Sequence, residues 1–110
     1  MTAFECMLVD EYDRAKRLIP GLEEEIAGLP RGAVVEKRRG GKVYHYLTRR
    51  EGGRVVTEYI PRDDVAEIRG KIELRKSLEA TLGAFRKTMK QVERALGCEP
   101  DEYIRHQDIR

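Results

Sequence analysis

The sequence predicts an α+β fold in which a helix, a three-stranded antiparallel β-meander and a long helix follow one another. Three observations lead to it: an apolar repeat at steps of three and four before residue 30, a change to Val-, Tyr- and Thr-rich segments around two Gly-Gly pairs, and a second three-four repeat ending at Leu96. We expect the two helices to form an antiparallel stalk with the small sheet at one end. A chain of 110 residues fits one domain.

The first segment, residues 1–30, has the apolar seam of a bundle or coiled-coil helix. Its seam positions are Leu8, Tyr12, Ala15, Ile19, Leu22, Ile26 and Leu29. The seam continues in phase across Pro20-Gly21, so we expect one helix kinked near Pro20 rather than two helices. Pro30 disfavours helical geometry at the preceding residue, and the helix should therefore stop there.

Residues 31–61 are predicted to form the meander, with strands at about 33–39, 42–50 and 54–60. The pairs Gly40-Gly41 and Gly52-Gly53 suit tight hairpin turns, because glycine adopts positive φ without strain. If each turn has two residues, the numbers of opposed residues add to 81 in the first hairpin and to 105 in the second. This register assigns every side chain of the meander to one of two faces.

The two predicted faces differ in composition. One carries the apolar residues Val34, Val43, Leu47, Val56 and Ile60 and should pack on a helix. The other has four bases and no acid, and its candidate nucleic-acid-binding residues are Lys37, Arg39, Lys42, Tyr44, Tyr46, Arg50 and Tyr59. Basic side chains neutralise phosphates, and tyrosine rings offer stacking surface and hydroxyl groups. This face therefore predicts nucleic-acid binding.

A structural explanation of the same face stays open. Tyr46 should lie opposite Tyr59, and Thr48 opposite Thr57, and such pairs stabilise any antiparallel sheet. Exposed Lys and Arg also protect a sheet from edge-to-edge aggregation.

A long helix should begin near Asp63 and end at Gly97, with residues 98–110 as a C-terminal tail. Its seam matches that of the first helix and consists of Leu78, Leu82, Phe85, Met89, Val92 and Leu96. Two helices alone bury only one seam, so we expect a homodimer formed through the stalk. Protein–protein interaction or self-association through the stalk is the alternative function.

Charge and hydropathy indicate the class of protein. Residues 31–62 carry nine bases and three acids, whereas residues 1–30 carry three bases and seven acids. No apolar run exceeds four residues, so we expect no membrane span, no secretory signal and a cytoplasmic location. Cys6 and Cys98 should then be reduced thiols.

No catalytic or metal site is predicted. His45, His106 and the two cysteines form no close ligand pair. The Gly-Gly pairs lack the residues of a phosphate loop, and Ser77 lacks the context of a nucleophile. We therefore expect a protein that is not an enzyme and uses no cofactor, metal or small-molecule substrate.

The meander and the start of the long helix carry a family resemblance over about residues 31–75. The runs concerned are Lys42-Val43-Tyr44-His45-Tyr46-Leu47, Arg49-Arg50-Glu51-Gly52-Gly53-Arg54 and Glu58-Tyr59-Ile60-Pro61. They resemble small, functionally unassigned bacterial proteins in which a tyrosine-rich strand and a Gly-Gly-basic hairpin precede a long charged helix. The strand-strand-strand-helix order is more distantly similar to the arm-type DNA-binding modules of tyrosine recombinases. Together these resemblances imply a nucleic-acid-binding or accessory module of a bacterial mobile or regulatory system.

Overall fold

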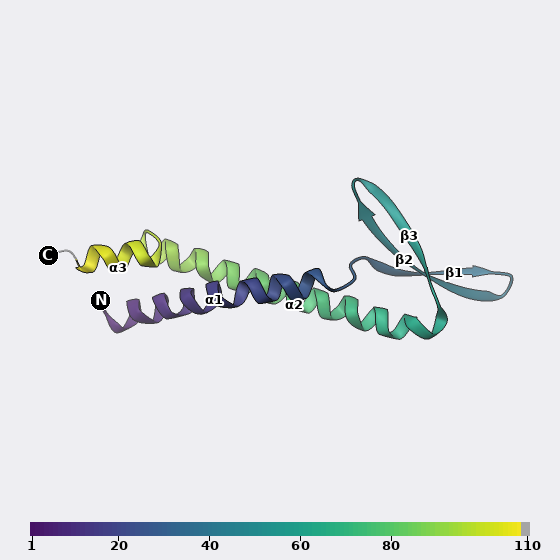
Figure 1. Ribbon diagram of the computed structural model, residues 1–110, viewed down its shortest axis with the longest axis horizontal. Helices are drawn as coiled ribbons and strands as arrows, with labels where there is room; N and C mark the ends of the chain where they lie inside the picture. Colours follow the sequence, from purple (N-terminus) through teal and green to yellow (C-terminus); the bar gives the residue numbers. More distant parts are fainter. Residues whose placement is uncertain (109–110) are drawn as a thin grey trace. The chain divides into compact units, whose positions relative to one another are not determined.

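The computed structural model describes residues 1–108 and contains helices and one three-stranded sheet (Figure 1). In chain order the elements are α1 (Ala3–Ala27), β1 (Ala33–Arg39), β2 (Lys42–Glu51), β3 (Arg54–Ile60), a 3₁₀ turn (Arg62–Asp64), α2 (Val65–Leu96) and α3 (Pro100–Asp108). The predicted α+β class and the order of helix, meander and long helix are confirmed.

The chain divides into two compact units. The first unit combines Met1–Glu25 with the chain from Glu79 onward, and the second unit is Ile26–Leu78. Helix α2 contributes its C-terminal half to the first unit and its N-terminal half to the second. None of the helices within residues 1–108 combines the length and the apolar character that crossing a bilayer requires.

In the first unit, α1 lies antiparallel beside the C-terminal half of α2 (Figure 1). The seam residues Tyr12 and Ala15 of α1 are buried, as are Leu82 and Val92 of α2. Polar contacts join the same elements: the Tyr12 hydroxyl donates to Glu93 Oε1 at 3.0 Å, and Arg86 Nη2 lies 3.7 Å from Glu23 Oε2. The predicted antiparallel pairing of the two helices is therefore confirmed for these segments.

Helix α1 continues through Pro20 as one element, as predicted. Its C-terminal end differs slightly from the prediction, because the helix stops at Ala27, two residues before Leu29. At its start, the Thr2 hydroxyl oxygen accepts a hydrogen bond from the backbone N–H of Glu5 at 3.1 Å, which satisfies one donor of the first turn.

The predicted tail contains a helix of its own. Helix α3 covers Pro100–Asp108, and the last two residues of the predicted tail, 109 and 110, lie outside the described residues. The Tyr103 hydroxyl donates to Glu5 Oε2 at 2.6 Å and so ties α3 to α1. This hydrogen bond raises the pKa of Tyr103 and lowers the pKa of Glu5.

Ionisation of Tyr12 should lower the stability of the first unit at alkaline pH. Burial and the hydrogen bond to Glu93 raise its pKa from 10.0 to about 12. A pKa that is higher in the folded state gives a contribution that is complete below about pH 10 and is lost as the pH rises through about 12. We expect the free-energy difference between the wild type and Tyr12→Phe, measured by urea unfolding, to shrink from pH 9 to pH 11.5. A constant difference would contradict this assignment.

The sheet of the second unit has the order β1-β2-β3, with both pairs antiparallel. Ala33 lies opposite Thr48, and His45 lies opposite Ile60, so opposed numbers add to 81 and 105 as predicted. The turn glycines all have positive φ, with values of 56° and 79° in the first hairpin and 55° and 80° in the second. The two-residue turns therefore set the register, and the register sets the faces.

The core of the second unit lies between one face of the sheet and the start of α2. Leu47 and Ile60 are buried against Ile72, and the half-buried residues around them are Val34, Val65 and Ile68. This confirms that the apolar face packs on a helix. Two residues of the predicted apolar face stay outside this core. Val43 lies past the end of β3 and is 44% exposed, and Val56 is half-buried but does not pack with the buried residues.

Candidate nucleic-acid interface

All seven residues predicted to bind nucleic acid lie on one face of the sheet, which we call the tyrosine face. These residues are Lys37 and Arg39 of β1, Lys42, Tyr44, Tyr46 and Arg50 of β2, and Tyr59 of β3. Helix α2 packs on the opposite face, through Leu47 and Ile60. The register of the two hairpins is therefore what gathers these side chains.

The tyrosine face is open to solvent. Its four basic residues are exposed, and Tyr59 keeps 58% of its surface exposed. Tyr44 and Tyr46 are half-buried. A partner could therefore reach the cations without displacing any element of the fold.

Charge is segregated between the two faces of the sheet. The acids of the strands are Glu36, Glu51 and Glu58, and all of them lie on the face that packs on α2. There Arg49 binds Glu51 at 2.9 Å and Glu58 at 2.7 Å, and Glu36 lies 3.4 Å from both His45 and Arg69. Hydrogen bonding by Arg49 also lowers the pKa of Glu58. The tyrosine face thus has cations but no carboxylate within its own strands.

The rings of the tyrosine face are not equivalent. Tyr46 and Tyr59 form an edge-on pair with ring centroids 5.9 Å apart and an interplanar angle of 69°. The Lys37 ammonium lies 5.2 Å from the centroid of the Tyr46 ring, as in a cation–π contact. Tyr46 therefore already has a cation over its ring, and Tyr59 offers the more accessible ring.

A hollow lies where β3 ends, and we call it the strand-end hollow. Its lining residues are Lys42, Val43, Tyr44, His45, Tyr59 and Arg62. Arg62 is a site residue that the sequence analysis missed. It follows Pro61, where the alternation of the strand stops, so the period-two pattern gives no direction for its side chain. The signal available was a basic residue two positions after a strand that ends in Tyr59-Ile60.

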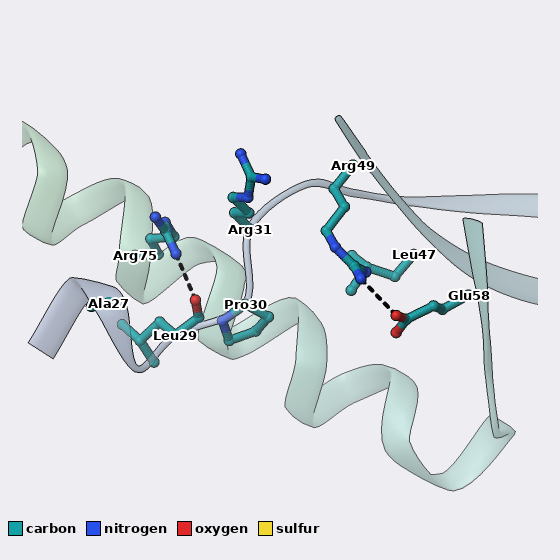
Figure 2. Close-up of a pocket in the computed structure, with 8 residues that line it drawn as sticks. All are labelled: Ala27, Leu29, Pro30, Arg31, Leu47, Arg49, Glu58 and Arg75. Atoms are coloured by element: carbon teal, nitrogen blue, oxygen red, sulfur yellow. Dashed lines mark hydrogen bonds and ion pairs between the residues drawn. The ribbon is translucent and has the colours of Figure 1, made fainter. Parts of the chain in front are cut away.

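Figure 2 shows a second hollow of the same unit, on the face that packs on α2, lined by Ala27, Leu29, Pro30, Arg31, Leu47, Arg49, Glu58 and Arg75. Arg75 Nη1 donates to the Leu29 carbonyl at 2.6 Å, and Arg31 Nη2 donates to the Arg50 carbonyl at 2.6 Å. Arg49 is paired with Glu58. Arg75 and Arg31 therefore fasten the link between α1 and β1 to its surroundings, and Arg49 joins β2 to β3. All three guanidinium groups thus have a structural use.

The described part of the chain shows neither a cluster of metal ligands nor an activated thiol. Within residues 1–108 no group of three or more His, Cys, Asp or Glu side chains is placed to hold a metal ion. Cys6 and Cys98 are both free thiols. Burial and the nearby Glu102 and Glu99 raise the pKa of Cys98, which disfavours its reactive thiolate form.

A family model described as a domain of unknown function, DUF6788, matches residues 12–70, which is more than half of the chain. The chain belongs to the DUF6788 family. The DUF6788 match contains the whole sheet, so every residue of the tyrosine face and Arg62 lie inside it. That DUF6788 has no known function agrees with the resemblance to functionally unassigned proteins. Comparison with curated proteins found no match, and comparison with solved structures found none either.

Proposed function

We propose that this protein binds nucleic acid through the tyrosine face and works without catalysis, as a nucleic-acid-binding or accessory module. The segregation of charge carries the proposal: four exposed bases share a face with three tyrosines, while the strand acids are paired on the other face. Such a face attracts phosphates and releases their counterions. The family resemblance supports a setting in a bacterial mobile or regulatory system, and we propose the cytoplasm as its location, as the hydropathy of the sequence predicts.

The spacing of the basic side chains on the tyrosine face suits an extended polyanion. Lys42 and Arg50 stand at opposite ends of β2, and at about 3.3 Å per residue the strand between them spans about 26 Å. Lys37 and Arg39 add charge on β1 at the end near Lys42. The three tyrosines fill the middle of the face, where the nucleobases of a bound strand could contact them.

Reversing a charge of the tyrosine face should weaken binding to nucleic acid. We expect Arg39→Glu and Arg50→Glu to lower the affinity for mixed-sequence DNA and RNA alike, and to reduce the slope of log K against log salt by about one or more. Fluorescence anisotropy between about 50 and 200 mM salt measures both quantities. The matched control is Arg38→Glu, which makes the same charge change one residue away but on the opposite face.

The control separates the face from the net charge. Near 150 mM salt the screening length is about 8 Å, so Arg38→Glu should retain most of the wild-type affinity. Equal losses for Arg38→Glu and Arg39→Glu would show that only the overall charge matters, and would contradict a role for the tyrosine face.

Self-association through the helices is the second candidate function. Phe4 and Met7 lie one turn apart on α1 and are 66% and 64% exposed, which leaves large apolar side chains for a second copy of the chain to cover. A protein that binds neither DNA nor RNA, yet sediments with a dimer mass at micromolar concentration, would favour this candidate over the first.

A further inference from the structure

We infer that the nucleic acid bound is single-stranded, with one unstacked base in the strand-end hollow and the neighbouring phosphates on Lys42 and Arg62. This inference rests on the proposed function and narrows it to one class of ligand. It also assigns a binding role to Arg62, which the proposed function does not use.

The hollow exists because β2 is longer than β3. The register of the second hairpin ends with His45 opposite Ile60, so residues 42–44 of β2 extend past the last paired residue of β3. At that point the chain turns away through Pro61 into the 3₁₀ turn. The space left beside β2 has a volume of about 600 Å³, within the usual 300–1,000 Å³ of small-ligand sites.

The lining of this hollow has the chemistry of a nucleotide site. Tyr44 and Tyr59 bring aromatic surface, and Lys42 and Arg62 bring exposed positive charge. No carboxylate is among the lining residues. The hollow of Figure 2 differs, because Glu58 lines it and its arginines bind backbone carbonyls and carboxylates. A base with its phosphates therefore fits the strand-end hollow better.

The tyrosine geometry favours a single strand over a duplex. A base can stack on a tyrosine ring only if the base has left its own stack, and in a duplex that requires breaking a base pair as well. Bases of a single strand are already free to turn out. Because Lys37 lies over the Tyr46 ring and Tyr59 is 58% exposed, Tyr59 is the ring on which we place the base.

The test compares a fluorescein-labelled 12-nucleotide DNA single strand of mixed sequence with its own blunt duplex, by anisotropy at 100 mM salt. The single strand should bind about tenfold more tightly than the duplex. Tyr59→Ala should weaken binding of the single strand about tenfold and leave duplex binding nearly unchanged, because stacking is lost but phosphate contacts remain. Tyr59→Phe, which keeps the ring, should bind as the wild type does.

Arg62→Gln provides a second and independent variant, because Arg62 is exposed and lies outside the strands. It should weaken binding of the single strand several-fold. Arg54→Gln, which removes a positive charge from the other face of the sheet, should not. Circular-dichroism melting verifies that each variant is folded.

Two results would overturn the inference. The first is equal affinity for the single strand and the duplex. The second is that Tyr59→Ala and Arg62→Gln weaken binding of the single strand no more than Arg54→Gln does. In both cases the proposed function would survive. Absence of binding to either probe would instead remove the proposed function together with this inference.

Discussion

Ile60→Ala should lower the free energy of unfolding by about 2–5 kcal/mol, because it removes a buried side chain and leaves a cavity. Ile60 is only 2% exposed and packs with Leu47 and Ile72. These three are the buried residues of the core of the second unit, with half-buried neighbours around them. So small a core has few side chains that could move in to fill the space. Urea unfolding followed by circular dichroism measures the loss.

Val55→Ala is the matched control for this prediction. It truncates an aliphatic residue of the same strand, but Val55 lies on the tyrosine face and is 65% exposed. Its cost should stay within about 0.5 kcal/mol. Similar losses for the two variants would mean that packing of Ile60 against α2 does not stabilise the sheet.

The register of the sheet and the membership of the tyrosine face could be predicted from the sequence because the two rest on local rules. A two-residue Gly-Gly turn allows one register, and alternation then assigns each strand residue to a face. Lys37 and Tyr59 come from different strands, yet their shared face follows from counting alone. The seams of α1 and α2 were predictable for the same kind of reason, since period and phase are local properties.

Other features of the site depend on information that no local period contains. Alternation assigns Val43 to the face that packs on α2. Its side chain is nevertheless 44% exposed, because Val43 lies past the end of β3, and alternation does not predict where β3 ends. Alternation puts Tyr46 and Tyr59 together, whereas the position of the Lys37 ammonium over one ring depends on side-chain conformation. Arg62 joins the site through the turn that follows Pro61. In this protein, the alternation of strand residues predicts which side chains share a face. The end of β3, the turn after Pro61 and the side-chain conformations decide which residues form the strand-end hollow.

Gly32→Ala should destabilise the protein by about 2 kcal/mol or more, although it adds only a methyl group. Gly32 lies between α1 and β1 with φ of 117°, a conformation that side chains rarely adopt and that costs about 1–3 kcal/mol. A Cβ at this position would also meet the Thr48 carbonyl oxygen and the Arg49 Cβ. Thr48 pairs with Ala33 in the sheet, so the clash falls on backbone that the register holds in place.

Gly70→Ala makes the same chemical change with the opposite expected sign. Gly70 lies inside α2, and a Cβ there would meet nothing within 4 Å. Alanine should therefore stabilise the helix by about 0.5–1 kcal/mol, since it reduces the entropy of the unfolded chain. Urea midpoints of the two variants should move in opposite directions from the wild type. A neutral Gly32→Ala would show that residues 28–32 can rearrange, and that the bonds of Arg75 to Leu29 and of Arg31 to Arg50 do not fix this link.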